Sequence, residues 1–260
     1  MADFSDRLLE AAGGSWVAPP GSPEKVKVLG KEPHYVAHAR GLINLMAASD
    51  GSWMWKDPKL SLLLPFWCDL LHDAVYIVVV RSPVSIALSL KRRDGFPLSA
   101  AVLLWQVYLV SLLRDLPENA PVLFLSYENL LSSPMASCGR LMEFLLAHSR
   151  ITQIGSMGPG QLCDRVRTSL CHSAHDAEDM SLLDDGQQRL YSFLKNLVEE
   201  RESIEGFVAQ NYPLYLGWRE YLQLWDGVFR FALREERKRF RLFPESKASR
   251  DLRNAAQRER

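Results

Sequence analysis

The apolar run from Val75 to Val80, VYIVVV, is the feature that most restricts the fold of this chain. Its continuous β-branched character is typical of a strand that is buried on both faces of a parallel sheet. The residues after it predict a helix, with Ser82 as the N-cap, Pro83 in the first helical position and Gly95 at the end. We therefore expect a buried strand that leads directly into a helix.

Other segments continue this alternation of strands and helices. A short strand is predicted at 52–55 (SWMW), ending at Lys56, and a further strand at 120–127 (APVLFLSY). Helical sequence occupies 60–73 and 96–113, between the predicted strands. This order and spacing indicates an α/β fold with a parallel sheet.

The first part of the chain is expected to be helical. Two helices are predicted, at 5–12 and at 33–48. The segment 13–25 between them, GGSWVAPPGSPEK, is rich in glycine and proline and is expected to lack regular structure.

The C-terminal half is expected to be largely helical and less regular. Residues 151–180 are polar and contain glycine, which predicts a loop region. We expect an α/β domain over 1–210, followed at 211–260 by an amphipathic helix and a basic tail. Apolar residues recur at helical spacing between 218 and 232, at Trp218, Tyr221, Leu222, Trp225, Val228, Phe229 and Ala232.

This C-terminal apolar stripe needs a partner surface, since so large an aromatic face is rarely left in water. It is expected to pack within the protein, in a homodimer, or against a partner chain. A membrane-bound helix would place its basic residues opposite the stripe. Here most of the basic residues follow the stripe instead, so a lipid partner is disfavoured.

The composition limits which other partners and which cellular compartment we expect for this protein. The 31 basic and 31 acidic residues cancel, so charge gives no reason to expect nucleic acid. The four cysteines lack metal-ligand spacing and are expected to be reduced, mostly buried thiols. The N-terminus is too charged for a signal peptide, and the apolar segment 96–113 contains Gln106 and two serines. We expect a soluble cytoplasmic protein with no metal ion.

Polar residues follow each predicted strand, where ligands bind in parallel α/β sheets. They are Lys56 and Asp57, then Arg81, and finally Tyr127 with Glu128. Arg81 ends its strand just before a helix whose N-terminal N–H groups attract anions.

Arg81 and Ser89 on that helix therefore form a candidate phosphate clamp. The alternatives are structural. Arg81 could cap the strand, Lys56 could reach water, Asp57 could form a turn, Tyr127 could be a partly buried aromatic, and Glu128 could complement the helix dipole.

Three segments together resemble bacterial sulfotransferases that use 3′-phosphoadenosine 5′-phosphosulfate (PAPS). They are 55–67 (WKDPKLSLLLPFW), 75–95 (VYIVVVRSPVSIALSLKRRDG) and 122–134 (VLFLSYENLLSSP). Residues 166–172 (VRTSLCH) and 186–194 (GQQRLYSFL) are similar to the later part of the same proteins.

The resemblance implies a parallel sheet of the P-loop nucleotide-kinase/sulfotransferase type and the use of PAPS, or its product PAP, as co-substrate. By this resemblance Arg81 and Ser89 bind the 3′-phosphate, Tyr127 lies beside the adenine, and Lys56 lies near the transferring sulfuryl group. Asp57 is a candidate base for the acceptor. The implied reaction is sulfuryl transfer to a hydroxyl or amine of a small molecule that the sequence does not identify.

The sequence departs from this family at one motif. Relatives begin with a strand and a Gly/Ser/Thr-rich loop that cradles the 5′-phosphosulfate. The glycines at 13–14 follow a predicted helix and precede prolines, and the segment 155–161 lacks a preceding apolar strand and a lysine. We therefore expect the chain to start downstream of that loop. The alternatives to an enzyme are a non-catalytic homologue that acts as a nucleotide-binding or interaction module, and a site whose loop another polypeptide supplies.

Overall fold

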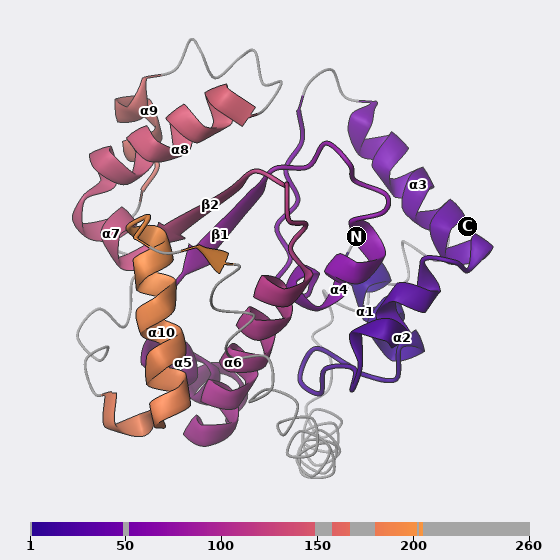
Figure 1. Cartoon of the computed structure of the whole chain (residues 1–260), viewed down its shortest axis with the longest axis horizontal. Helices are drawn as coiled ribbons and strands as arrows, with labels where there is room; N and C mark the ends of the chain where they lie inside the picture. The colour runs from indigo at the N-terminus through magenta and orange to yellow at the C-terminus, as the bar shows by residue number, and fades with distance from the viewer. Residues whose placement is uncertain (1, 49–51, 149–157, 167–179, 202, 205–260) are drawn as a thin grey trace, which may run out of the picture. The chain divides into compact units, whose positions relative to one another are not determined.

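The computed structural model of the chain describes residues 2–48, 52–148, 158–166, 180–201 and 203–204. In this part the fold is α/β, with many helices and a small two-stranded parallel sheet (Figure 1). The expected α/β class and the parallel pairing are confirmed. The predicted region 211–260, with the stripe from 218 to 232, lies outside the described residues.

The sheet consists of β1 (Tyr76–Val80) and β2 (Val122–Ser126), which lie side by side. The register places Tyr76 opposite Val122 and Val80 opposite Ser126. Both strands therefore end at the same level, and the residues that follow them become neighbours. Val79 of β1 is 56% exposed, so β1 is not buried on both faces as its apolar run predicted.

The prediction of a strand at 52–55 is wrong, because residues 52–57 have no regular structure. The burial of these residues does alternate with the period of two that indicates a strand: Trp53 and Trp55 are half-buried, while Met54 is exposed. No described strand pairs with the segment. Instead the Trp55 ring meets the Trp67 ring edge-on at 4.7 Å, so aromatic packing fixes the segment.

The helix after β1 forms as its sequence predicts. It is α5 (Pro83–Asp94), and the Ser82 side chain accepts a hydrogen bond from the Ser85 N–H. Gly95 ends the helix in the left-handed conformation, with φ of 74°. These local signals fix the direction in which the chain leaves the sheet.

The next helix, α6 (Leu98–Asp115), packs against α5 and against α4 (Leu60–Trp67). Residues 100–107 are buried without interruption, which confirms the predicted buried helix. In the described part of the chain, α6 is the one helix long and apolar enough to cross a membrane by length and composition alone.

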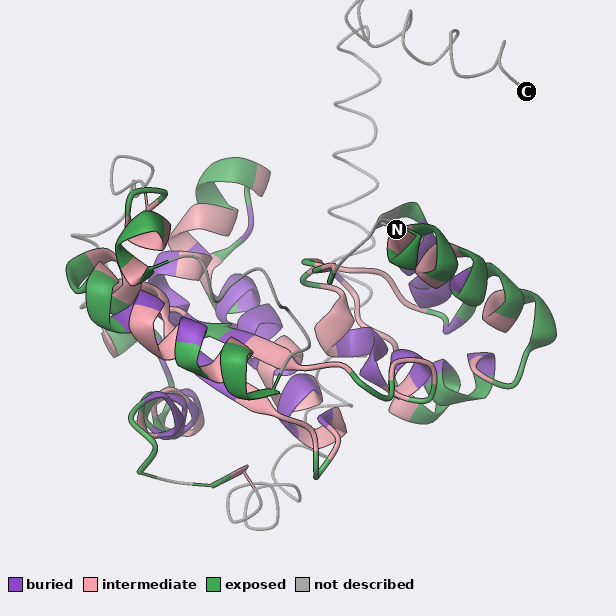
Figure 2. Cartoon of the chain, turned by 90° about the horizontal axis from the view of Figure 1, so that it is seen from above, coloured by how far each residue is buried: buried purple, intermediate pink, exposed green. Residues whose placement is uncertain are grey.

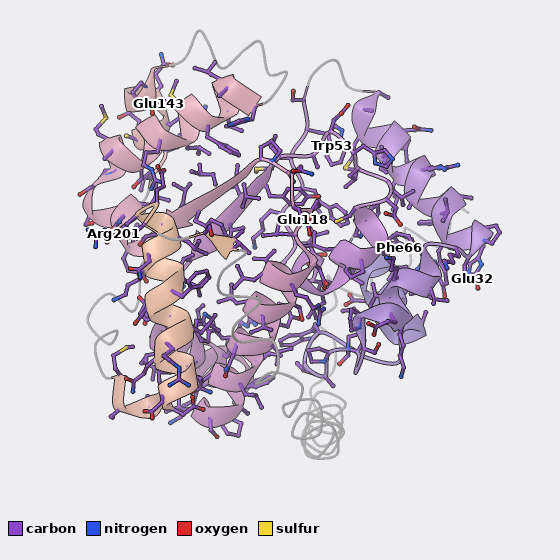
Figure 3. All side chains as sticks on the ribbon, in the orientation of Figure 1. Glu32, Trp53, Phe66, Glu118, Glu143 and Arg201 are labelled. Carbon is purple, nitrogen blue, oxygen red and sulfur yellow. The ribbon has the colours of Figure 1, made fainter. Side chains whose placement is uncertain are left out.

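Three helices precede the sheet: α1 (Ala2–Ala11), α2 (Pro23–Leu29) and α3 (Pro33–Ala47). The helix α2 begins inside the segment predicted to be irregular, because Ser22 caps its N-terminus and Pro23 takes the first position. An aromatic cluster joins α1 to α4, with the Phe4 ring 6.1 Å from the Phe66 ring (Figure 3 labels Phe66).

Three helices follow β2 in the described part: α7 (Tyr127–Ser132), α8 (Pro134–His148) and α9 (Pro159–Cys163), and then the 3₁₀ turn η3 (Met180–Leu182). The loop predicted at 151–180 thus contains a helix, and its remaining residues are largely outside the described part.

The last described helix, α10 (Asp185–Val198), starts with a capping box between Asp184 and Gln187. It packs against β1 and β2, and buries an apolar face (Figure 2 shows burial along the helices). The buried apolar residues of α10 are Leu190, Phe193, Leu194, Leu197 and Val198.

The two glycines Gly95 and Gly139 give a matched test of this local structure. A Cβ at either position meets nothing within 4 Å, so only backbone conformation differs. Gly95→Ala should destabilise the protein by about 1 kcal/mol, because alanine disfavours positive φ. Gly139→Ala, inside α8, should instead stabilise by about 0.5–1 kcal/mol. Urea unfolding measures both, and shifts of the same sign would contradict the assigned conformation of Gly95.

Candidate functional site

The strand ends of β1 and β2 bring Arg81 and Tyr127 together. The Arg81 Cζ lies 4.4 Å from the centroid of the Tyr127 ring, which is a cation–π contact. Because the strands end level with each other, the residue after each strand is placed beside the other. The guanidinium and the Tyr127 ring therefore lie at the same edge of the sheet.

A carboxylate links the same two strand ends. The Ser82 N–H donates to Glu128 Oε1 at 2.9 Å, and the Ser126 hydroxyl donates to Glu128 Oε2 at 3.1 Å. Ser82 is only 1% exposed, so its N–H depends on this acceptor rather than on water. Glu128 therefore ties the start of α5 to the end of β2.

This bridge changes what the N-terminus of α5 can do. The Ser82 N–H is bound to Glu128, Pro83 has no N–H, and the Ser85 N–H donates to Ser82 Oγ at 3.3 Å. The expectation of free N–H groups at this helix start is thus corrected, since the chain's own groups already occupy most of them. An anion at this edge must be held chiefly by side chains.

Ser89, the second member of the predicted clamp, is half-buried on α5. Ser85 follows Ser82 by three residues and Ser89 follows Ser85 by four, so the three serines share one side of the helix. Seven residues of helix place Ser89 roughly 10 Å along the axis from Ser82. A phosphate bound by both Arg81 and Ser89 therefore requires the long Arg81 side chain to reach along this side of α5.

Lys56 and Asp57 belong to a different set of contacts. Lys56 is exposed, and Asp57 Oδ1 accepts the Lys59 N–H at 3.0 Å in the turn before α4. The other oxygen, Asp57 Oδ2, is buried, and no described residue hydrogen-bonds to it. Within the described residues, no hydrogen bond or ion pair joins Lys56 or Asp57 to Arg81 or Tyr127. The structural alternative for Asp57, a turn aspartate, accounts for its observed bond.

An ion pair holds this turn against the first helix, and a separate hydrogen bond ties α6 to the loop between α1 and α2. Lys59 Nζ lies 2.8 Å from Asp6 Oδ1, and its side chain is only 14% exposed. The Tyr108 hydroxyl donates to the Trp16 carbonyl oxygen at 2.7 Å. Burial, and then the charges of Asp57 and Asp6, raise the pKa of Tyr108, so it stays neutral. Sequence reasoning missed this role of Lys59, because its partner Asp6 is remote in the sequence.

Tyr191 of α10 was also missed as a neighbour of the strand ends. Burial, and then the charge of Glu128, raise the pKa of Tyr191 to about 12. Its ring lies 6.4 Å from the Trp105 ring of α6, and Lys195 Nζ lies 5.2 Å from its centroid. The only sequence signal was the likeness of 186–194 to the later part of sulfotransferases.

The chain's donor set gives no indication of a metal centre in the described part, where no three His, Cys, Asp or Glu side chains form a group able to hold a metal ion. No family model matches the chain, and neither a curated protein nor a solved structure matches it. The residues at the strand ends and the motifs in the sequence therefore give the best indication of function.

The Glu128 bridge predicts a stability cost that a comparable surface glutamate lacks. Glu128→Ala should destabilise the protein by about 2 kcal/mol, because it leaves the buried Ser82 N–H without its acceptor. Glu128→Gln should cost less, since one carbonyl oxygen remains. Urea unfolding measures both changes.

The control is Glu143→Ala, which removes an exposed carboxylate from α8 (labelled in Figure 3). That change should stay within about 0.5 kcal/mol of wild type. Equal effects of the two alanine variants would show that the bridge adds no stability.

Proposed function

We propose that this protein binds a 3′-phosphorylated adenosine nucleotide, PAPS or its product PAP, at the edge formed by Arg81 and Tyr127. The reaction proposed for the site is sulfuryl transfer from PAPS to a hydroxyl or amine of a small acceptor. In this proposal Arg81 and Ser89 hold the 3′-phosphate and Tyr127 lies beside the adenine. Lys56 stabilises the sulfuryl group, and Asp57 is the candidate base.

The observation that supports this proposal most is the contact between Arg81 and Tyr127. The two residues come from different motifs of the sulfotransferase resemblance, and they meet at 4.4 Å at the carboxyl ends of adjacent parallel strands. Ligands of parallel α/β folds bind at this edge. A guanidinium beside an aromatic ring suits a ligand that joins a phosphate to a planar base.

The parallel arrangement of β1 and β2 also supports a finer fold proposal. Each strand leads into a helix, α5 or α7, within two residues. Because of this connection and the three motifs, we propose that the sheet is of the P-loop nucleotide-kinase/sulfotransferase type. The described residues contain two parallel strands of such a sheet, and its other strands are part of the proposal.

A second candidate function is nucleotide binding without catalysis. It is favoured by the separate contacts of Lys56 and Asp57, which bond around the start of α4 rather than with Arg81. Neither described strand is followed by a glycine-rich loop, because β1 leads into Ser82 and Pro83 and β2 leads directly into α7. A 5′-phosphosulfate would then lack the N–H cradle that stabilises its charge.

The 3′-phosphate contact predicts a difference between two nucleotides in calorimetric titration. PAP should bind more tightly than AMP, which lacks the 3′-phosphate. Arg81→Ala should weaken PAP binding by about 2 kcal/mol, because charge-assisted hydrogen bonds are lost. The same variant should leave AMP binding nearly unchanged.

The matched control is Arg40→Ala, which removes an exposed arginine from α3 and should leave PAP binding as in wild type. If PAP and AMP bind with equal affinity to the wild-type protein, the proposed 3′-phosphate site is wrong.

An assay of sulfuryl transfer distinguishes the two candidate functions, an enzyme and a non-catalytic binding module. With radiolabelled PAPS and a panel of phenols, alcohols and amines, we expect turnover by this chain alone to stay well below the ~1 per second usual for enzymes. The physical reason is the lack of a phosphosulfate cradle among the described residues. Turnover at the usual enzymatic rate, lost in Lys56→Ala, would overturn this expectation and assign Lys56 to catalysis.

A further inference from the structure

Two cysteines meet where α9 packs against α8. Cys138 of α8 is 3% exposed, and Cys163 is the last residue of α9. The Cys163 thiol lies 3.3 Å from Met135 Sδ, and it is near enough to Cys138 to influence the pKa of the Cys138 thiol. Met135 and Cys138 are three apart on one face of α8, so Cys163 is held against that face.

The two thiols differ in how far solvent can reach them. Cys163 is half-buried, so a small oxidant can reach it, whereas Cys138 lies in the core. Burial, and then the hydrogen bond with Cys163, raise the pKa of Cys138 to about 11. Because a peroxide can reach Cys163 and not the buried Cys138, Cys163 is the thiol that reacts first and Cys138 the one that reacts second. The expectation that the cysteines are mostly buried is wrong for Cys68 and Cys163, which are half-buried.

We propose that Cys138 and Cys163 form a disulfide between α8 and α9 when the protein meets a peroxide. The Cys163 thiolate attacks one peroxide oxygen, the O–O bond breaks, and the departing hydroxide takes a proton to leave as water. This step leaves a sulfenic acid on Cys163.

In the second step the Cys138 sulfur gives up its proton and attacks the Cys163 sulfur. The S–S bond forms, the S–O bond breaks, and the departing hydroxide becomes a second water. The two thiols lose two electrons and two protons in total, and one hydrogen peroxide becomes two waters.

The position of the pair gives this disulfide a structural consequence. α8 packs against α7, which begins at Tyr127, and against β2. A bond between Cys138 and Cys163 closes a loop in the unfolded chain and so lowers its entropy. The oxidised protein should therefore be the more stable form, whether or not it binds a nucleotide.

The test uses the full chain, reduced, freed of reductant and treated with one equivalent of hydrogen peroxide. Remaining thiols are alkylated, and the digest is analysed by mass spectrometry. We expect one linked pair of peptides, containing Cys138 and Cys163, and an alkylated Cys68. The melting temperature should rise by roughly 5–10 °C and return on reduction.

Two variants complete the test. Cys138→Ser should give no linked peptides and should leave a sulfenic acid on Cys163 that dimedone traps. Cys171→Ser is the control and should form the same link as wild type. Linkage of Cys138 or Cys163 to another cysteine, or full alkylation of both after peroxide, would overturn the proposal.

Discussion

The carboxylate of Glu128 is the group on which the described site depends. One side chain accepts hydrogen bonds from the Ser82 N–H and from the Ser126 hydroxyl, and so joins residues at the ends of two parallel strands. Two parallel strands alone are a marginal unit, because few ladder bonds hold them. Here α10 and α8 pack against the sheet, and the Glu128 bridge fixes the edge that the ligand is proposed to use.

The same carboxylate sets the electrostatics of that edge. It lies at the N-terminus of α5, where negative charge is favourable, and it occupies a position that an external anion could otherwise take. A bound phosphate would then be attracted by Arg81 and repelled by Glu128. The affinity for a phosphate at this edge therefore depends on how far from Glu128 the Arg81 guanidinium holds it. A phosphate placed along the side of α5 that carries Ser89 would be farther from Glu128.

Sequence reasoning predicted the local features here and failed where distant contacts decide. Ser82, Pro83 and Gly95 specify the bounds of α5 through capping and turn chemistry, which neighbouring residues determine. The segment 52–55 has the periodicity of a strand but no strand beside it, and periodicity alone cannot supply a partner.

The predictions for the candidate site show the same difference between local features and distant contacts. The strand-end rule selected both Arg81 and Tyr127, and the structure brings them into contact because the carboxyl ends of parallel strands share one edge. Lys56 was assigned to that edge through a strand that does not form. Glu128 appeared in the sequence only as a residue of the first helical turn, and its bond to Ser82 follows from the register of the two strands.

Hydrogen exchange of the Ser82 amide, followed by NMR, tests the central role of Glu128 most directly. We expect this amide to be protected in the wild-type protein and to exchange roughly tenfold faster or more in Glu128→Ala. The Ile86 amide, which donates to the Ser82 carbonyl oxygen within α5, should change much less. Exchange of the Ser82 amide at the same rate in both proteins would contradict the bridge between the two strand ends.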